Sequence, residues 1–313
     1  MTLQQLKYVI KTVECGSISE AAKQLFISQP SLSNTIKEME AELGLELFSR
    51  SAKGIALSLD GAEFLSYARQ VVEQAELLEQ RYKDKKPAKR LCSISTQHYA
   101  FSVNAFVNLV RQTDVDEYEF TLRETRTYEI IEDVKNMRSE IGVLYLNAFN
   151  EKVITKLLRE NQLTFNSLFT ANPHVFVSSE NPLAAKSSVT LQDLEDYPCL
   201  SFEQGEYNSF YFSEEILSTV YHKKSIRVSD RATLFNLLIG LNGYTICTGV
   251  LSSDLNGSSI ISIPLETEEN MTVGWITNSK AVLSRFASGY IDELKRLITE
   301  YGFDILPFKD KGD

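Results

Sequence analysis

The chain has 313 residues and a formal net charge of −10, with 43% hydrophobic and 24% charged residues. This composition is typical of a soluble protein with more than one domain, and the negative charge argues against a protein that coats nucleic acid over its whole surface. No apolar run approaches the ~18 residues that a membrane span needs, and Lys7 and Lys11 interrupt any N-terminal signal peptide. We therefore expect a cytoplasmic protein with no membrane partner.

The cysteines and histidines lack the spacing of a metal site. The four cysteines stand far apart without a C-x-x-C pair, and the three histidines are equally scattered. The sequence contains no nucleophile elbow and no phosphate-binding loop. It therefore predicts that the protein has no metal and no cofactor, and that it is not an enzyme.

The N-terminal residues have the pattern of a helix-turn-helix. A first periodic stretch over 3–15 ends at Gly16, and a second short helix follows. Ser28 is then a good N-cap, and Pro30 fits the first turn of the next helix. Apolar residues recur on one face of that helix at steps of four, three and four before Gly44 ends it: Leu32, Ile36, Met39 and Leu43.

The other side of this last helix carries short polar groups and one cation, which suit base edges and phosphates in a major groove. We expect DNA contacts from this side and from two cations that follow it: Gln29, Pro30, Ser31, Ser33, Asn34, Lys37, Arg50 and Lys53. Residues 1–60 contain six cations and seven anions, so DNA binding has to come from local placement of charge. A helical hairpin with a solvated polar face is the alternative that periodicity alone leaves open.

Two further elements complete this part of the chain. Short apolar stretches at 45–48 and 55–59 predict a two-stranded wing. From Asp60 onwards there is no proline until Pro87, and basic residues indicate a solvated hinge over 81–87. The intervening helix has a heptad seam that is typical of pairing with a second chain, although a helix on its own domain shows the same pattern: Phe64, Ala68, Val71, Ala75, Leu78 and Tyr82.

Beyond residue 90, short β-like stretches alternate with helical ones, which predicts an α/β fold with parallel β-α-β units. Strands are expected at 91–95, 118–124, 141–146, 174–178, 198–202, 226–228, 244–247, 260–263 and 272–277. Helices are expected at 103–110, 128–137, 210–220, 232–240 and 285–301.

The N-terminal residues resemble those of the LysR-type transcriptional regulators. The resemblance is carried by Ala21-Ala22, Leu25, Ser28-Gln29-Pro30-Ser31, Ser33, Ile36, Glu40, Leu43-Gly44, Leu47-Phe48 and Arg50, and then by Gly54-Ile55, Leu57-Ser58 and Gly61. The stretches CGSISEAAKQLFISQPSLSN and GAEFLSYARQVVEQAELLEQRY are further similar to the Gram-positive branch linked to methionine and cysteine supply.

This resemblance implies a winged helix-turn-helix domain over 1–59 and a linker helix with hinge for dimerisation over 60–90. It also implies a C-terminal effector domain like a periplasmic binding protein, with α/β subdomains over 91–162 plus 269–313 and over 163–268. The implied assembly is a homodimer or homotetramer on double-stranded DNA, with RNA polymerase as a further candidate partner.

In that fold, a small-molecule effector lies in the cleft between the subdomains, at the carboxyl ends of strands. The positions that this rule selects are Ser95, Thr96, Gln97, Tyr99, Thr125, Thr127, Phe202, Glu203, Gln204, Ser229 and Asp230. The segment 95–99 is similar to the one that holds an anion or a small sulfur-pathway metabolite in the cysteine-regulon activators of the family. Helix capping is the competing interpretation of Thr125, Thr127, Ser229 and Asp230. For Glu203, the competing interpretation is an exposed surface residue without a ligand.

We therefore expect a DNA-binding regulator that responds to a small, polar, anionic metabolite, either an amino acid or a sulfur-pathway intermediate. Its targets would be the uptake or synthesis of methionine and cysteine. The alternative is a DNA-binding regulator without a small-molecule effector, whose C-terminal domain serves assembly only. An enzyme on a binding-protein fold is disfavoured by the N-terminal sixty residues.

Overall fold

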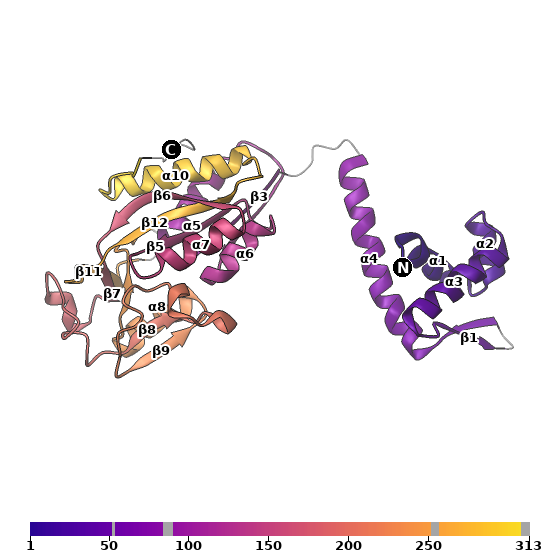
Figure 1. Ribbon diagram of the computed structural model, residues 1–313, viewed down its shortest axis with the longest axis horizontal. Coiled ribbons are helices and arrows are strands. Elements are labelled where there is room, and N and C mark those ends of the chain that lie inside the picture. Colours follow the sequence, from indigo (N-terminus) through magenta and orange to yellow (C-terminus); the bar gives the residue numbers. More distant parts are fainter. Residues whose placement is uncertain (52–53, 84–89, 252–256, 308–313) are drawn as a thin grey trace. The chain divides into compact units, whose positions relative to one another are not determined.

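The computed structural model describes residues 1–51, 54–83, 90–251 and 257–307, with the side chains of 50, 51, 54, 80–83 and 90 left out (Figure 1). The chain divides into two compact units, Met1–Ala88 and Lys89–Asp313. Each unit has a hydrophobic core of its own. Among the described residues, no helix has the length and apolar character needed to cross a membrane.

The N-terminal unit is a winged helix-turn-helix with a long helix at its end. Helices α1 (Leu3–Cys15), α2 (Ile18–Gln24) and α3 (Gln29–Leu43) precede the hairpin of β1 (Phe48–Ser51) and β2 (Gly54–Leu57), and α4 (Leu59–Lys83) follows. Ser28 caps α3 as predicted, because its hydroxyl accepts the N–H of Ser31 at 3.2 Å. Gly16 and Gly44 end α1 and α3 in left-handed backbone, with φ of 62° and 68°.

The apolar face predicted for α3 forms the core of this unit. Leu32, Ile36 and Met39 are buried in one cluster with Ala21 and Ala22 of α2. Burial of this face fixes the opposite face of α3 toward solvent, which confirms the predicted helix-turn-helix.

The wing begins later than predicted. The sequence places the first strand at 45–48, whereas β1 starts at Phe48. The reason is a contact with α3, because the Glu40 carboxylate accepts the N–H groups of Leu47 and Phe48 at 2.8 and 3.2 Å. Gly61 of α4 is required beside this segment, since a Cβ there would lie 2.1 Å from the Leu47 carbonyl oxygen.

The C-terminal unit consists of two subdomains. Subdomain I is built on a five-stranded sheet in the order β4-β3-β5-β12-β6, in which β3 is parallel to β4 and β5, and β12 is antiparallel to β5 and β6. Its strands are β3 (Arg90–Thr96), β4 (Tyr118–Glu124), β5 (Ile141–Leu146), β6 (Leu163–Ala171) and β12 (Met271–Asn278). Helices α5 (Ala100–Arg111) and α10 (Arg285–Glu300) cover one face, and α6 (Thr127–Lys135) and α7 (Glu151–Glu160) cover the other.

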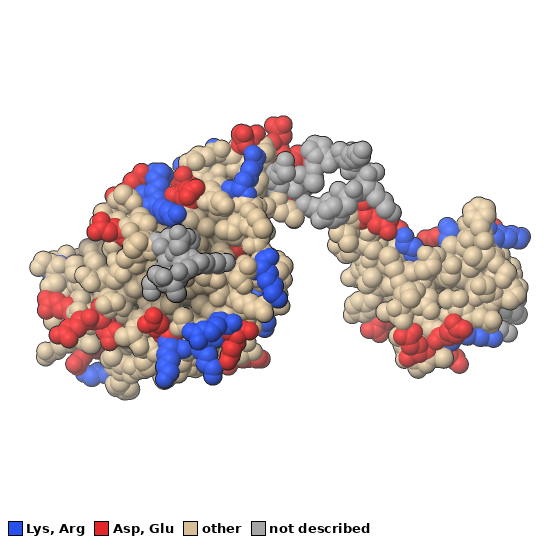
Figure 2. All heavy atoms as spheres, turned by 45° about the horizontal axis from the view of Figure 1, so that its top comes forward, with Lys and Arg blue, Asp and Glu red and all other residues tan. Residues whose placement is uncertain are grey.

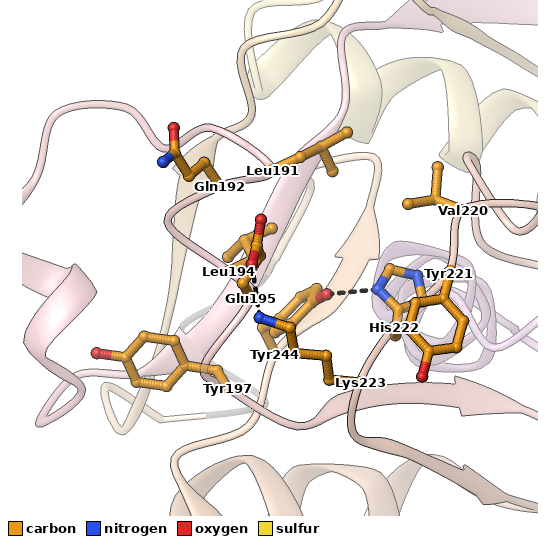
Figure 3. A pocket seen from close by; sticks show the side chains of 10 residues that line it. All are labelled: Leu191, Gln192, Leu194, Glu195, Tyr197, Val220, Tyr221, His222, Lys223 and Tyr244. Atoms are coloured by element: carbon orange, nitrogen blue, oxygen red, sulfur yellow. Dashed lines mark hydrogen bonds and ion pairs between the residues drawn. The ribbon is translucent and has the colours of Figure 1, made fainter.

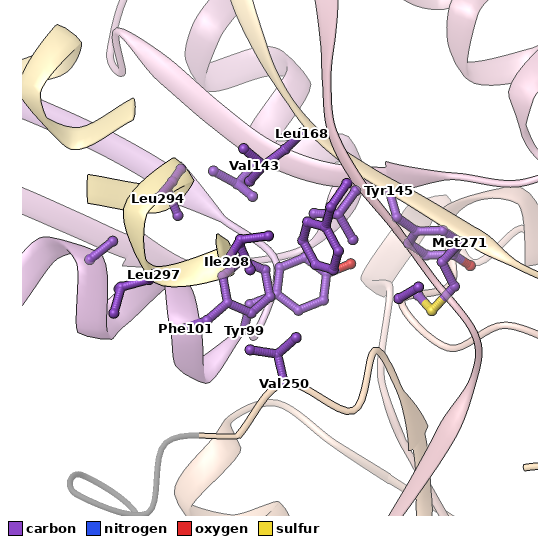
Figure 4. Close-up of a cluster of buried hydrophobic side chains, with 14 of the residues drawn as sticks. Tyr99, Phe101, Val143, Tyr145, Leu168, Val250, Met271, Leu294, Leu297 and Ile298 are labelled. Atoms are coloured by element: carbon purple, nitrogen blue, oxygen red, sulfur yellow. The ribbon is translucent and has the colours of Figure 1, made fainter. Parts of the chain in front are cut away.

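Both faces of this sheet are buried, which explains the continuous apolar run of β5. Val143 and Tyr145 lie in the cluster that contains Phe101 of α5 and Leu294 of α10 (Figure 4). Leu144, which points to the opposite face, lies in the cluster with α6 and α7. Parallel strands buried on both faces are expected to be apolar at every position.

Subdomain II carries two small sheets and one long helix. An antiparallel sheet has the order β10-β7-β11, and a parallel pair joins β8 to β9. The strands are β7 (His174–Ser178), β8 (Cys199–Phe202), β9 (Ser225–Val228), β10 (Thr245–Cys247) and β11 (Ile260–Pro264). Helix α8 (Arg231–Leu241) packs on them, and the short turns are η1 (Pro182–Ala185), η2 (Gly205–Tyr207) and η3 (Phe210–Phe212).

Two predictions of organisation are wrong. The sequence assigns 163–268 to the second subdomain, yet β6 pairs with β12 from Met271↔Ala171 to Asn278↔Leu163 and is an edge strand of subdomain I. The helix predicted at 210–220 does not form. This segment contains only η3 and turns, and Leu217 has a left-handed backbone with φ of 62°. Two neighbouring carboxylates of this segment, Glu214 and Glu215, are buried in the unit instead.

Candidate functional site

Helix α3 exposes the side chains that the sequence predicts to read DNA. Gln29, Pro30, Ser31, Asn34 and Lys37 are exposed, and the neighbouring Ser33 is half-buried. Within the described part of the chain, no hydrogen bond or ion pair engages the polar groups of Gln29, Asn34 or Lys37. The donors and acceptors of this face are therefore available to a partner.

The cations predicted for phosphate contacts are only partly described. Lys37 is exposed on α3, whereas Lys53 and the side chain of Arg50 lie outside the described residues. Figure 2 shows basic and acidic side chains interspersed on the face in view, without one large basic surface. This agrees with the net charge of the chain, and the exposed side of α3 is the candidate DNA interface.

The long helix α4 divides the predicted seam between two sides. Ala68 is buried against α1, whereas Tyr67, Val71 and Leu78 are 63%, 51% and 59% exposed. The spacing of the three exposed residues places them along one stripe of the helix. An exposed apolar stripe of this kind is a candidate pairing surface. The side chain of Tyr82, the last residue of the predicted seam, lies outside the described residues.

The predicted effector residues after β3 are buried and bonded to one another. The Thr96 hydroxyl donates to the Gln97 carbonyl oxygen at 2.8 Å. The Gln97 amide donates through Nε2 to Thr127 Oγ1 at 2.6 Å, and its Oε1 accepts the Tyr99 hydroxyl at 2.8 Å. These residues come together as the strand-end rule predicts, but their polar groups already have partners within the chain.

Ser95 has a different role from the one predicted. Its hydroxyl donates to Asp133 Oδ2 of α6 at 2.7 Å, lies 2.8 Å from Ser139 Oγ and is fully buried. These partners belong to subdomain I, so Ser95 ties β3 to α6. It is not a cleft residue, and its assignment to the effector site is wrong.

The remaining predicted residues separate into caps and cross-cleft contacts. Asp230 caps α8, because its Oδ1 accepts the N–H of Thr233 at 2.8 Å, so the capping interpretation holds there. The Thr125 hydroxyl donates to Glu129 in its own segment. Glu203 forms an ion pair with Arg126, which joins the two subdomains.

Two other cross-cleft contacts were not foreseen from the sequence. Arg231 at the start of α8 bonds Glu124 at the end of β4, with Nε–Oε1 and Nη2–Oε2 distances of 2.9 and 3.3 Å. The N–H of Thr127 donates to Gln204 Oε1 at 3.1 Å. Each contact joins residues more than seventy positions apart, which no local pattern can reveal.

The carboxylate of Glu214 occupies the turn between β3 and α5. Its Oε2 accepts the backbone N–H of His98 at 2.9 Å and lies 2.9 Å from His98 Nδ1, and its Oε1 accepts Gln204 Nε2 at 3.2 Å. The His98 ring stacks on Phe202 with centroids 3.9 Å apart. Burial lowers the pKa of His98, but the hydrogen bond and charge of Glu214 outweigh it and leave the pKa raised.

This carboxylate lies where the sequence predicts an anionic effector. Tyr99, the N-cap residue of α5, makes no side-chain cap, so the carboxylate of Glu214 beside His98 supplies negative charge at that helix end. One cavity between the subdomains, beside His98 and Glu214, is about 40 Å³, and another, beside Tyr145 and Glu215, is about 90 Å³. Each volume suits a few water molecules and not a metabolite, so the cleft is closed.

Comparison with known families identifies this architecture. The family described as "Bacterial regulatory helix-turn-helix protein, lysR family" matches residues 3–62, and "LysR substrate binding domain" matches residues 114–298. The chain belongs to the LysR family. It is a transcriptional regulator with an N-terminal DNA-binding domain and a C-terminal effector-binding domain, and the family is one of DNA-binding regulators rather than enzymes.

Relatives and solved structures agree with this assignment. YbhD of Escherichia coli (strain K12), an uncharacterized HTH-type transcriptional regulator, is 26% identical over 309 residues, which cover 95% of this chain and 92% of YbhD. YybE of Bacillus subtilis (strain 168), described in the same words, is 26% identical over 197 residues, 62% of this chain and 64% of YybE. The crystal structure of full-length CbnR complexed with the target DNA has a TM-score of 0.51 at 19% identity and covers 95% of this chain and 100% of CbnR, a likeness of fold alone.

A separate pocket of this LysR-family protein lies outside the cleft. It measures about 240 Å³ and sits before the amino ends of β8 and β9 (Figure 3). The Tyr244 hydroxyl lies 3.0 Å from His222 Nδ1, and burial lowers the pKa of His222. An ion pair of Lys223 with Glu195 at 2.8 Å borders the pocket. Among the described residues, no three His, Cys, Asp or Glu side chains are grouped so that they could hold a metal ion.

Proposed function

We propose that this LysR-family regulator recognises its operator with the exposed side of α3. The available polar groups of that side support the proposal, because amides and hydroxyls at a helix N-terminal half suit base edges in the major groove. Cations beside the helix would hold the phosphates. The proposed base-edge residues are Gln29, Pro30, Ser31, Ser33 and Asn34, and the proposed phosphate contacts are Lys37, Arg50 and Lys53.

We further propose that two chains pair through the exposed stripe of α4 and that pairs assemble into a tetramer. Tyr67, Val71 and Leu78 support this proposal, because they are large apolar side chains left in solvent by the packing of α4 on α1. A pair of winged domains would contact two half-sites related by two-fold symmetry.

For the C-terminal domain, we propose a small metabolite with a carboxylate as the effector. The single observation behind this proposal is the carboxylate of Glu214 on the N–H of His98. A ligand carboxylate would replace it there and compete with the internal acceptors of Thr96 and Gln97, which are the Gln97 carbonyl oxygen and Thr127 Oγ1. An amino acid or a sulfur-assimilation intermediate is the leading candidate, and the proposed link to methionine and cysteine supply comes from sequence resemblance.

Replacement of Glu214 would have a mechanical consequence. Glu214 belongs to subdomain II and His98 to subdomain I, so the contact helps to hold the subdomains together. Ligand binding that is stronger in one subdomain arrangement than in the other shifts the population toward that arrangement. The shift would change the spacing of the paired DNA-binding domains.

The alternative is a regulator whose C-terminal domain serves assembly only. The closed cleft, with cavities of about 40 and 90 Å³ and internally bonded polar groups, is the observation that favours it. A thermal-shift screen of the full chain separates the two functions, because a ligand that binds only the native state raises its stability.

The screen would use amino acids, O-acetylserine, homocysteine and sulfate on the wild type and on Glu214→Gln. A carboxylate effector should bind the variant about tenfold more tightly, because the competing internal carboxylate is absent. Absence of any stabilisation in both proteins would contradict the effector proposal and favour the alternative. Genome-wide footprinting of the bound protein would test the sulfur link through the genes that flank its sites.

A further inference from the structure

Subdomain II contains a polar groove that adjoins the cleft and shares Phe202, Glu215 and Ile246 with the cavity there. Its floor is the face of the β8–β9 pair that points away from α8, where Ser201 lies opposite Arg227 in the strand register. Leu200 and Val228, on the other face of the same strands, pack against α8. The segment that carries η3 lines the opposite side, and the groove encloses about 300 Å³. This volume is at the lower end of the range for ligand pockets.

One end of the groove is formed by the carboxyl group of Glu215. Its side chain lines the groove although the residue is only 7% exposed. One oxygen accepts the N–H of Phe202 at 2.8 Å. Within the described residues, no cation forms an ion pair with this carboxyl group. The carboxyl group therefore has capacity for a positively charged partner.

Arg227 supplies a charge of the opposite sign in the same groove. It is exposed on β9, and no described residue forms a hydrogen bond or ion pair with its guanidinium. A guanidinium presents paired N–H donors that match a carboxylate in a two-bond geometry. Ser201, opposite Arg227, and Ser225, two residues before it on β9, contribute hydroxyl groups to the wall.

We propose that this groove binds a small linear zwitterion, with its ammonium group on Glu215 and its carboxylate on Arg227. Because the acid is buried and the arginine is exposed, the ammonium group would lie inside the groove and the carboxylate at its surface. An ω-amino acid has this chemistry, whereas an α-amino acid carries both charges on one carbon. The groove would be a second ligand site of the regulator beside the cleft.

The protonation of Glu215 provides a readout that a purely structural role would not produce. Burial and the charge of Glu214 raise the pKa of Glu215 to about 8, so this acid is largely protonated at neutral pH. An ammonium group beside it favours the carboxylate, and binding would release a proton. The groups facing Glu215 from the packed elements are Glu214, Arg227, Tyr99, Tyr145, Glu269, Cys199 and Cys247.

The test is calorimetry on the full chain with a ladder of ω-amino acids from β-alanine to 6-aminohexanoate. Each probe is matched by the carboxylic acid without the amine and by the amine without the carboxylate. We expect one length to bind about tenfold to a hundredfold more tightly than both of its matched controls, because each charge-assisted hydrogen bond contributes that factor. Runs in buffers of different ionisation enthalpy should show proton release at pH 7.

Two variants assign the contacts. Arg227→Gln, an exposed change that should fold, is expected to reduce affinity for the ω-amino acid to that of the matched amine. Glu215→Gln should reduce it to that of the matched acid and abolish proton release. Lys223→Gln, which removes a surface cation outside the groove, is the control and should bind like the wild type.

Three outcomes would overturn the proposal. The first is that no member of the ladder binds the wild type at millimolar concentrations. The second is binding that Arg227→Gln leaves unchanged. The third is binding that is lost in Arg231→Gln but kept in Arg227→Gln, which would place the ligand in the cleft and leave the proposed effector function standing.

Discussion

Replacing Glu214 by alanine should loosen the closed arrangement of the subdomains. The carboxylate accepts the His98 N–H at 2.9 Å and Gln204 Nε2 at 3.2 Å, and it pairs with His98 Nδ1 at 2.9 Å. Both side chains of the His98–Glu214 pair are 4% exposed, so solvent does not screen the contact. A hydrogen bond to a buried charged group contributes about 1.5–3 kcal/mol, and truncation leaves its partners unpaired.

The variant should lose about 3 kcal/mol of unfolding free energy. This is less than the summed contributions of the three contacts, because His98 can become neutral and water can enter the space. For a unit of this size, a loss of about 3 kcal/mol lowers the Tm by about 6–12 °C. Scanning calorimetry of the full chain measures this change in Tm from the unfolding transition of the unit Lys89–Asp313. Formate, which replaces the missing carboxylate, should restore part of the Tm in the variant.

The matched control is Glu195→Ala. Glu195 also forms an ion pair, with Lys223 at 2.8 Å, but the two side chains are 55% and 61% exposed. Exposed pairs contribute about 0–1 kcal/mol, so this variant should scarcely change the Tm and should not respond to formate. The reasoning is refuted if the two variants lose equal stability, or if formate stabilises neither or both alike.

Three further predictions concern DNA, assembly and pH. Ser33→Ala or Asn34→Ala should weaken the free energy of binding to the specific operator by about 1–3 kcal/mol and that to random DNA only a little, as measured by fluorescence anisotropy. Equal losses of binding free energy on both DNAs would mean that these side chains do not read sequence. Val71→Glu combined with Leu78→Glu should dissociate the protein because two charges would enter an apolar seam, and a variant that stays dimeric by light scattering would place the interface elsewhere. The pKa of Glu215 is raised from 4.5 to about 8 in the folded chain, so between these values the native state keeps a proton that the unfolded chain releases. The stability that the protonated acid contributes is therefore lost as pH rises through about 8. Glu215→Gln should therefore gain stability relative to the wild type between about pH 5 and 9 in urea titrations, and a difference that does not change with pH would contradict this.

The N-terminal unit could be predicted from sequence because its signals are local. Ser28, Pro30 and Gly44 mark the ends of α3, and the apolar residues between them recur at helical spacing. Each signal acts within one or two helical turns, where the backbone needs a cap or a buried face. The start of the wing was misplaced because it depends on Glu40, which reaches the N–H groups of residues seven and eight positions away.

In the C-terminal unit, the sequence predicted the β/α alternation but not which strands pair. β6 and α7 were not predicted as elements, and the assignment of β6 to the second subdomain was wrong. An edge strand is half-buried and lacks the apolar run of a central strand such as β5. Its place is set by pairing with β12, about a hundred residues later, and tertiary structure alone decides such a pairing.

The candidate effector site shows the same division between local and tertiary information. The rule that ligands bind at the carboxyl ends of parallel strands selected Gln97 and Thr127, and the structure brings these two into contact at 2.6 Å. The same rule could not reveal that Glu214 lies beside His98, because the two residues are 116 positions apart and the segment of Glu214 has no regular structure. Sequence determines where a helix or strand begins and ends through short-range hydrogen bonds and burial periodicity. The position of Glu214, in a segment without helix or strand at that point, depends on the contacts that fold the chain back, and only the tertiary structure shows them.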